Sequence, residues 1–239
     1  TGKTTLVSAL VKVLPRLKMK SLLLAPTGRA AKVMAGYSSR SAFTIHKIIY
    51  KPKEEVSGLG FGFILQKNYF KDTVFIVDES SMLSDDGGMS GKLLGDLVRF
   101  VFSGENNRLL LVGDTAQLPS VGIEYSPALE SAYLQRQFRL NASQIELTEV
   151  MRQRQESGIL FNATGLRQLL GEKDPQIKLK TVGFRDIFKM TGERLEDGLR
   201  YGYDKFGREN TVIVTRSNKN AVQYNQYIRR MIFFYENEI

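Results

Sequence analysis

Three short, uninterrupted apolar runs determine what this chain can fold into. They are SLLLA at 21–25, TVFIVDE at 73–79 and RLLLVGD at 108–114, and the second and third end in acidic residues. A run of this kind is typical of a strand that is buried on both faces of a parallel sheet. Helical stretches separate the runs, so the order predicts an α/β fold with helices on both faces of the sheet. Ligands of such folds bind at the carboxyl ends of the strands.

The segments around these runs show where the pattern is regular and where it is interrupted. Helical spacing follows Gly2 and ends near Pro15, and it begins again at Thr27. A segment rich in glycine and in aromatic and aliphatic residues, 52–68, contains a possible hairpin. Because it breaks the alternation of strands and helices, we interpret about 51–71 as an insertion.

The character of the sequence changes near residues 150 to 156. Beyond this point, TVIVTRS at 211–217 predicts one further strand, and NKNAVQYNQYIRRMIFF after it predicts a helix. We therefore predict a first domain over residues 1–150, which includes the insertion, and a partial second domain over residues 151–239.

Charge and composition narrow the classes of function. The 239 residues carry 34 Lys and Arg against 25 Asp and Glu, a formal charge of +9, which favours a polyanionic partner. The absence of cysteine excludes disulfides and thiolate zinc sites, and a single histidine excludes polyhistidine metal sites. A cysteine-free chain is compatible with the cytoplasm, and no apolar run predicts a membrane span. Because the chain begins on threonine without a signal peptide, we expect a fragment that lacks its natural amino terminus.

The first residues, TGKTT, match the rear half of a phosphate-binding loop, G-x-x-x-x-G-K-[ST]. In such a loop Lys3 would reach the β- and γ-phosphates of a nucleotide, and the Thr4 hydroxyl would bind Mg²⁺. A helical pattern follows at once, as the motif requires. On its own the triplet Gly2-Lys3-Thr4 also fits a surface lysine at an ordinary helix start.

Two acidic strand ends supply the rest of a nucleotide site. Asp78 and Glu79 follow one apolar run, where an aspartate can hold Mg²⁺ and a glutamate can take a proton from an attacking water. Gln117 lies in the loop after Gly113 and Asp114, within reach of a γ-phosphate. Each feature alone fits an ordinary solvated loop, but the three in this order predict a P-loop NTPase.

Six ordered motifs make the chain resemble the superfamily 1 DNA helicases, specifically their RecD-like branch. The motifs are TGKTT, APTGRAAKVM at 25–34, TIHK at 44–47, VDESSM at 77–82, VGDTAQLPSVG at 112–122 and LTEVMRQ at 147–153. VTRSNKNAVQYNQYIR at 214–229 is similar to a strand and helix of the second motor domain in this family. The resemblance implies a RecA-like first domain, part of a second RecA-like domain, and the cofactors ATP and Mg²⁺.

The resemblance also implies a role for individual residues. Glu79 would activate water, Gln117 would couple nucleotide state to DNA, and Arg152 would reach the γ-phosphate, where a guanidinium stabilises developing charge. The nucleotide-binding positions are Gly2, Lys3, Thr4 and Thr5, and the metal-binding positions are Thr4 and Asp78. Arg152 alone also fits a surface position at a helix start.

The resemblance implies single-stranded DNA as the partner. Nuclease or recombination subunits are further candidate partners. The implied DNA-contact positions are Pro26, Thr27, Gly28, Arg29, Lys32, Thr44 and His46. Lysine and arginine there suit phosphates without reading sequence. His46 equally suits the capping or packing of the helix that follows it.

Four aromatic residues of the insertion have two interpretations: Phe61, Phe63, Tyr69 and Phe70. They suit base stacking or a strand-separating pin. They equally suit a small apolar cluster, which is the interpretation we favour.

The implied activity is an ATP-dependent DNA helicase or translocase, with 5′-to-3′ movement and a role in recombination or repair. Two later helicase motifs, V and VI, do not occur before Ile239. We therefore expect weak or absent hydrolysis by residues 1–239 alone. Two alternatives remain, a non-motor nucleic-acid-binding scaffold with a degenerate ATP site and a small-molecule kinase built on a P-loop.

Overall fold

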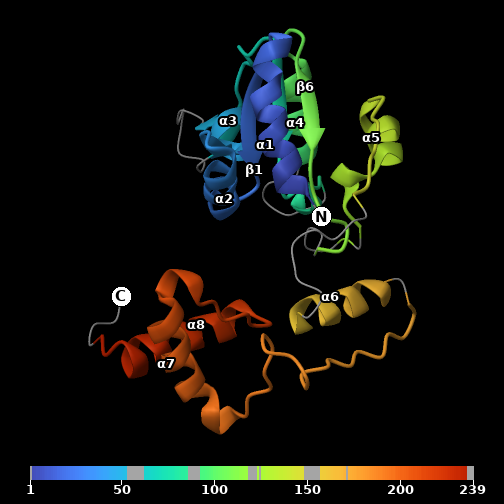
Figure 1. The fold of residues 1–239 in the computed structure, drawn as a ribbon. Helices are drawn as coiled ribbons and strands as arrows, with labels where there is room; N and C mark the ends of the chain where they lie inside the picture. The colour runs from blue at the N-terminus through green and yellow to red at the C-terminus, as the bar shows by residue number, and fades with distance from the viewer. Residues whose placement is uncertain are drawn as a thin grey trace. The chain divides into compact units, whose positions relative to one another are not determined.

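The computed structural model of the chain describes residues 2–52, 62–85, 92–117, 123, 125–147, 157–170 and 172–235. The chain divides into two compact units, unit 1 (Thr1–Gln153) and unit 2 (Arg154–Ile239) (Figure 1). Each unit is described by itself.

Unit 1 is built on a four-stranded sheet with the strand order β2-β1-β5-β6. The strands are β1 (Lys20–Ala25), β2 (Ala42–Thr44), β5 (Thr73–Val77) and β6 (Arg108–Leu111). All three pairings are parallel; Leu23 lies opposite Ala42 on one side and opposite Ile76 on the other. The apolar runs at 21–25, 73–79 and 108–114 form the central strands and one edge, which confirms the predicted α/β class.

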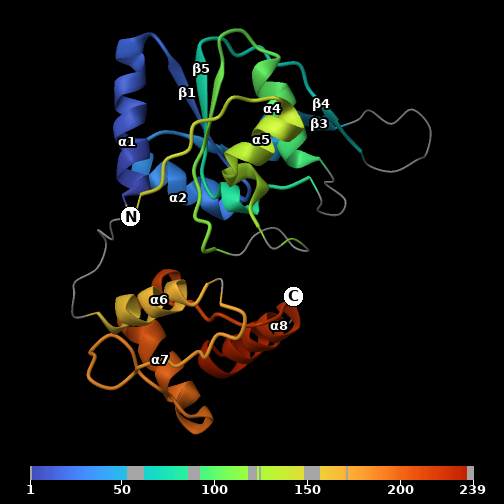
Figure 2. The same cartoon turned by 90° about the vertical axis from the view of Figure 1, so that its right-hand side faces the viewer.

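The α-helices of the described part of unit 1 cover both faces of this sheet (Figure 2). They are α1 (Lys3–Val13), α2 (Gly28–Ser38), α3 (Ile45–Ile49), α4 (Leu93–Phe102) and α5 (Ser131–Phe138). Helix α1 passes into a 3₁₀ turn that has Pro15 near its start, so the helix ends where proline predicts. Helix α2 starts at the predicted point, because the Thr27 side chain accepts a hydrogen bond from the Ala30 N–H at 3.2 Å.

The alternation of side chains along each strand produces two apolar cores. Phe75 and Val77 of β5 point into the core under α3, α4 and α5, whereas Val74 and Ile76 point into the core under α1 and α2. All five residues of β5 are buried. Burial on both faces explains why this strand reads as a continuous apolar run.

The first part of the insertion forms the predicted hairpin, and its last residues pack against the core of unit 1. Strands β3 (Tyr50–Pro52) and β4 (Phe63–Leu65) pair antiparallel, and the residues at 53–61 lie outside the described ranges. Further along, the buried Asn68 side chain donates a hydrogen bond to the Phe100 carbonyl at 2.7 Å, and the Phe70 ring meets Phe75 edge to face. Residues 68–70 therefore belong to the main body of unit 1.

Unit 2 contains α6 (Gly158–Gln168), α7 (Leu195–Phe206) and α8 (Asn218–Tyr227), which continues into a π-helical turn over Ile228–Ile232. The helix predicted after the 211–217 segment is present, but the strand is not. Among the described residues of unit 2, none is in a strand, although Thr211 has extended backbone angles. A strand needs a neighbour to pair its N–H and C=O groups, and no neighbouring strand is formed here.

Within the described ranges, no helix has both the length and the apolar character needed to cross a membrane.

Candidate active site

The carboxyl ends of the parallel strands and the start of α1 lie at the same end of unit 1 (Figure 1). Gly2 precedes α1 with a φ of 64°, a left-handed conformation that glycine adopts without strain. Because glycine has no side chain, α1 lacks a side-chain cap at its N-terminus. A helix N-terminus of this kind is suited to phosphate. Thr4 and Thr5 lie with Lys3 in its first turn.

Lys3 connects the start of α1 to the end of β6. Its Nζ donates a hydrogen bond to the Gly113 carbonyl at 3.0 Å and lies 3.9 Å from the Asp114 carboxylate. About a quarter of the Lys3 side chain remains exposed, so the ammonium group is open to a second anion. The lysine thus lies among the strand ends where the sequence predicts a nucleotide.

Glycine is required at position 113 because the backbone there lies very close to Leu129 and Ser81. A Cβ at that position would come within 2.7 Å of the Leu129 side chain and 3.0 Å of the Ser81 backbone nitrogen. The turn at Ser80–Met82 is joined to the same segment, since the Ser80 N–H donates to the Val112 carbonyl at 2.9 Å. The loop after β5 and the loop after β6 are therefore packed against each other.

Asp78 and Glu79 leave β5 directly into this region. The Asp78 carboxylate accepts a hydrogen bond from the Glu79 N–H at 2.9 Å on one oxygen and from the Tyr37 hydroxyl at 2.7 Å on the other. Glu79 has a φ of 55°, an unusual conformation for a residue with a side chain. Such strain is found most often at functional sites.

The surroundings of the Glu79 carboxyl group raise its pKa, which suits a general base. Burial raises the pKa of its carboxyl group, the neighbouring carboxylates of Asp78 and Asp114 raise that pKa further, and the Lys3 ammonium lowers it. A glutamate with a raised pKa is a stronger proton acceptor than an ordinary surface glutamate.

Gln117 lies in a tight turn after β6. The Asp114 side chain accepts from the Ala116 N–H at 3.0 Å, and the Gln117 N–H donates to the Asp114 carbonyl at 3.0 Å. The Gln117 side chain is exposed. Pro119 and Gly122 of the VGDTAQLPSVG motif lie outside the described residues, as does Arg152.

The predicted DNA contacts follow β1 and β2 at the carboxyl edge of the same sheet. Thr27, Gly28, Arg29 and Lys32 are exposed, while Pro26 is half-buried. Two of the predicted contacts also have local structural roles. The Thr27 hydroxyl caps α2, and the Thr44 hydroxyl caps α3 by accepting from the Lys47 N–H at 3.3 Å. The His46 ring is half-buried 5.5 Å from the Tyr50 ring.

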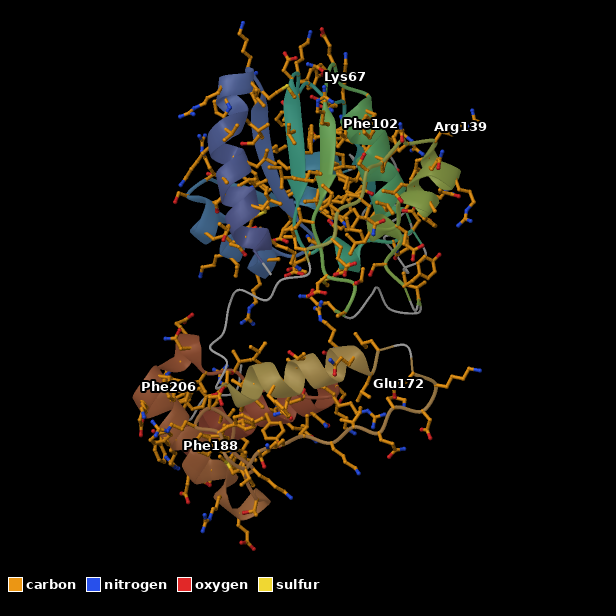
Figure 3. The ribbon with its side chains drawn as sticks, turned by 45° about the vertical axis from the view of Figure 1, so that its right-hand side comes forward. Lys67, Phe102, Arg139, Glu172, Phe188 and Phe206 are labelled. Atoms are coloured by element: carbon orange, nitrogen blue, oxygen red, sulfur yellow. The ribbon has the colours of Figure 1, made fainter. Side chains whose placement is uncertain are left out.

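The aromatic residues of the insertion separate into two groups. Phe70 packs in the core against Phe75 and Phe100, so it is not a stacking surface. Phe63 and Tyr69 are 70% and 79% exposed, and Phe61 lies outside the described residues. The Lys67 ammonium covers the Tyr69 ring at 5.4 Å, and Lys67 lies at the end of unit 1 opposite to the start of α1 (Figure 3).

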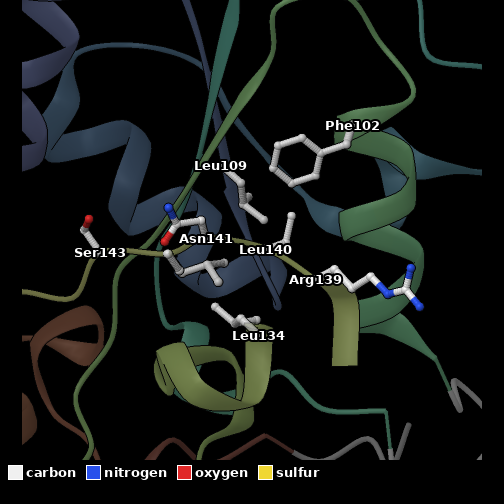
Figure 4. A pocket seen from close by; sticks show the side chains of 9 residues that line it. Phe102, Leu109, Leu134, Arg139, Leu140, Asn141 and Ser143 are labelled. Atoms are coloured by element: carbon white, nitrogen blue, oxygen red, sulfur yellow. The ribbon is translucent and has the colours of Figure 1, made fainter. Parts of the chain in front are cut away.

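A surface hollow of about 380 Å³ lies between α4, β6 and the chain after α5 (Figure 4). Its walls are largely apolar, with Phe102, Leu109 and Leu140 among them. Leu109 and Leu140 belong to the core under α4, on the face of the sheet away from α1. None of the predicted nucleotide residues lines it, so it is separate from the candidate active site.

Magnesium fits the residues at this site. Among the described residues, no group of three or more His, Cys, Asp or Glu side chains is placed to hold a metal ion. Mg²⁺ is commonly held by only one or two carboxylates, with water and nucleotide phosphates as its other ligands. One carboxylate, Asp78, close to a lysine that can bind phosphate, fits that requirement.

Comparison with known proteins shows the family of this chain. The family described as AAA domain matches residues 1–123. The chain therefore belongs to that family, and its α/β sheet with helices on both faces is a RecA-like P-loop domain. A similar protein is the ATP-dependent RecD2 DNA helicase of Deinococcus radiodurans, 34% identical over 170 residues, which are 70% of this chain and 20% of that helicase. The resemblance to RecD-like superfamily 1 helicases is thus confirmed.

Sequence reasoning missed two residues of this region. Asp114 was predicted only as a strand end, yet it lies beside Lys3, and the Gly-Asp pair after a buried strand was a usable signal. Tyr37 was not predicted to have any role. No local pattern indicates that a tyrosine in α2 contacts an aspartate 41 positions away.

Proposed function

We propose that this chain carries the ATP-hydrolysing part of a DNA helicase or translocase. The observation that supports the proposal most strongly is the position of Lys3, which joins the start of α1 to Gly113 and Asp114 beside the Asp78-Glu79 pair. Lysine, aspartate and glutamate at one sheet edge are the groups that nucleotide hydrolysis requires. The relative's printed name, an ATP-dependent DNA helicase, supports the same activity.

Within this proposal, the residues at the start of α1 bind the nucleotide. Lys3 exchanges its Gly113 contact for the β- and γ-phosphates, which the helix N-terminus also attracts. Thr4 and Asp78 hold Mg²⁺, which neutralises charge on the transferring phosphoryl group when bound. Gly2 and Thr5 complete the loop around the phosphates.

Glu79 takes a proton from the attacking water, and its raised pKa favours that transfer. Gln117 senses the γ-phosphate from the turn after β6, and Arg152 stabilises the transferring charge. Single-stranded DNA crosses the same sheet edge at Pro26 to Arg29, Lys32, Thr44 and His46. Their exposed cationic members, Arg29 and Lys32, contact phosphates.

Residues 1–150 then form the first motor domain and residues 151–239 part of a second. The alternating exposure of the 211–215 segment supports this assignment. Ile213 packs on the apolar cluster of unit 2, while Val212 and Val214 are 60% and 91% exposed, an alternation with the period of a strand although these residues are not in one. Movement in the 5′-to-3′ direction, a role in recombination or repair with nuclease subunits, and a cytoplasmic location belong to the proposal.

The test is ATP hydrolysis by the complete polypeptide that carries this sequence, with and without single-stranded DNA. We expect DNA to stimulate hydrolysis, and Glu79→Gln to reduce the rate about 10²- to 10⁴-fold while DNA binding persists. Glu105→Gln is the matched control, because Glu105 pairs with Lys71 on the surface, outside the site.

Two outcomes would contradict the proposal. DNA binding without any ATP hydrolysis would indicate the non-motor scaffold. Equal hydrolysis by Glu79→Gln and Glu105→Gln would show that Glu79 is not the base.

A further inference from the structure

We propose that Tyr37 is a positioning residue for Asp78, and that it links the magnesium site to helix α2. The inference rests on the proposed function, because it concerns the metal and DNA sites named there. Tyr37 lies in the last turn of α2, whose first turn carries the proposed DNA contacts Gly28 and Arg29. Its hydroxyl donates to the Asp78 carboxylate at 2.7 Å.

The two hydrogen bonds on Asp78 determine the orientation of its carboxylate. The Glu79 N–H holds one oxygen at 2.9 Å and the Tyr37 hydroxyl holds the other at 2.7 Å. A carboxylate has about four lone-pair sites, so roughly two remain for a metal ion or for its bound water. Tyr37 therefore does not block the metal, and it restricts the carboxylate to one rotamer before the metal arrives.

Tyr37 is itself held in place. Its ring packs at the edge of the core under α1 and α2, and its backbone carbonyl accepts a hydrogen bond from the Ser8 hydroxyl at 3.0 Å. Ser8 lies on α1, the helix that begins with Lys3 and Thr4. Tyr37 therefore connects both elements of the proposed nucleotide site to α2: its backbone carbonyl contacts α1, and its hydroxyl contacts the end of β5.

Helix α2 is anchored along one face by buried side chains. Ala31, Met34 and Ser38 are buried along it, and the Ser38 hydroxyl donates back to the Met34 carbonyl at 2.6 Å. Arg29 and Tyr37 are separated by about 12 Å of helix at 1.5 Å per residue. A shift of α2 when its first turn contacts a phosphate strand would move the Tyr37 hydroxyl relative to Asp78.

The substitution Tyr37→Phe removes the hydroxyl and keeps the ring, so packing is preserved. Groups that orient a metal ligand typically contribute 10- to 100-fold to metal affinity. Because Asp78 keeps the Glu79 N–H as a second constraint, we expect an effect of about 10-fold, at the lower end of that range.

The matched control is Tyr50→Phe. The Tyr50 hydroxyl also donates to an aspartate, Asp96, at 2.8 Å, but this pair joins β3 to α4 and includes none of the proposed nucleotide or metal residues. A general loss of stability from a missing tyrosine–aspartate hydrogen bond should occur in both variants. A loss of metal affinity should occur only in Tyr37→Phe.

The experiment titrates Mn²⁺, a spectroscopic substitute for Mg²⁺, into the complete polypeptide with ADP and follows free Mn²⁺ by electron paramagnetic resonance. We expect about tenfold weaker Mn²⁺ binding for Tyr37→Phe and no change for Tyr50→Phe, with metal-free ADP affinity unaffected in both. Equal Mn²⁺ affinity in Tyr37→Phe and the unsubstituted protein, or no Mn²⁺ binding by the latter, would overturn the inference.

The link to DNA is tested in the same titration with a single-stranded oligonucleotide added. DNA should shift the Mn²⁺ affinity of the unsubstituted protein, and Tyr37→Phe should reduce that shift; an identical shift in both would overturn the link. If Tyr37→Phe lowers the melting temperature too far, Ser8→Ala replaces it, since it frees the α2 carbonyl and keeps the phenol. A smaller loss of Mn²⁺ affinity there supports the inference, and none overturns it.

The outcomes separate this inference from the proposed function. Unchanged metal affinity with DNA-stimulated hydrolysis intact would remove Tyr37 from the mechanism and leave the helicase proposal standing. Absence of hydrolysis with the Tyr37 effect on Mn²⁺ present would contradict the motor and leave the positioning role.

Discussion

Units 1 and 2 contain similar strand-forming sequences, but within the described ranges a sheet is present in unit 1 alone. Among the described residues, the buried apolar side chains lie in unit 1 except for Leu199, Ile228 and Ile232. In β5, TVFIV is buried along its whole length between two layers of helices. In unit 2, the similar TVIVT contributes Ile213 to one small cluster and leaves its neighbours exposed. A run of β-branched residues thus becomes a strand only where other strands lie beside it.

The largest expected effect compares the core of unit 1 with the small apolar cluster of unit 2. Phe75 is fully buried between Phe70 and Phe100, and Phe75→Ala should lower the free energy of unfolding of unit 1 by about 3–5 kcal/mol. Ile228→Ala in unit 2 should cost about 2 kcal/mol, the lower end for such a change, because the small cluster around it can collapse. Hydrogen exchange followed by mass spectrometry reports each unit separately. Equal losses would show that unit 2 is packed as tightly as unit 1.

The same contrast explains how much of the fold could be predicted. Strands β1, β5 and β6 were predictable because their side chains pack against an apolar core on each face, which leaves a continuous apolar run. Strand β2 (Ala42–Thr44) is only three residues long and ends in threonine, so it has no such run. The strand expected at 211–217 was wrong because pairing depends on chain segments that a local pattern does not include.

The residues of the candidate site also differ in whether a local sequence pattern indicates their position. Lys3, Asp78 and Glu79 could be predicted because each follows a motif or a strand end, and the topology of a parallel sheet brings strand ends together. The Tyr37 contact with Asp78 could not, since it depends on the direction of one side chain at the end of α2. Gly113 was predicted only as part of a strand end, yet the closeness of Leu129 and Ser81 shows why glycine is needed there.

A smaller effect compares two helix caps. Thr27→Ala and Ser217→Ala each remove a hydroxyl that accepts a backbone N–H, at 3.2 Å in both cases, with an expected loss of about 1 kcal/mol of local stability. Helix α2 is held by three buried residues and α8 by none within Asn218–Tyr227. Exchange protection should therefore fall over more of α8 than of α2.

Thr27→Ser and Ser217→Thr, which keep a hydroxyl at each position, serve as controls for these caps. Fraying confined to the first turn in both helices would weaken the contrast between the units.

The smallest expected effect is a loss of helix stability at acid pH, and it should be confined to helix α6 of unit 2. Asp186 accepts hydrogen bonds from the Ser157 hydroxyl at 2.6 Å, the Gly158 N–H at 2.8 Å and the Ile159 N–H at 3.3 Å, and thereby closes the start of α6. The Ser157 hydroxyl bond, followed by the backbone bonds, lowers the pKa of Asp186. Because the pKa of Asp186 is lower in the folded state, its carboxylate stabilises α6 at pH values above about 3.9, the ordinary pKa of aspartate. This stabilisation is lost as the pH falls from that value through the pKa of the folded state.

The cap of α2 in unit 1 is the neutral hydroxyl of Thr27, which does not titrate in this range. Exchange protection at the start of α6 should therefore fall as the pH drops below about 3.9, whereas protection at the start of α2 relative to its unit should stay constant. Asp186→Asn keeps the shape and removes the charge, so it should lower protection of α6 at pH 6 and remove its pH dependence. An equal acid response in both helices would mean that solvent screening removes the Asp186 contribution, as it does for many exposed charges.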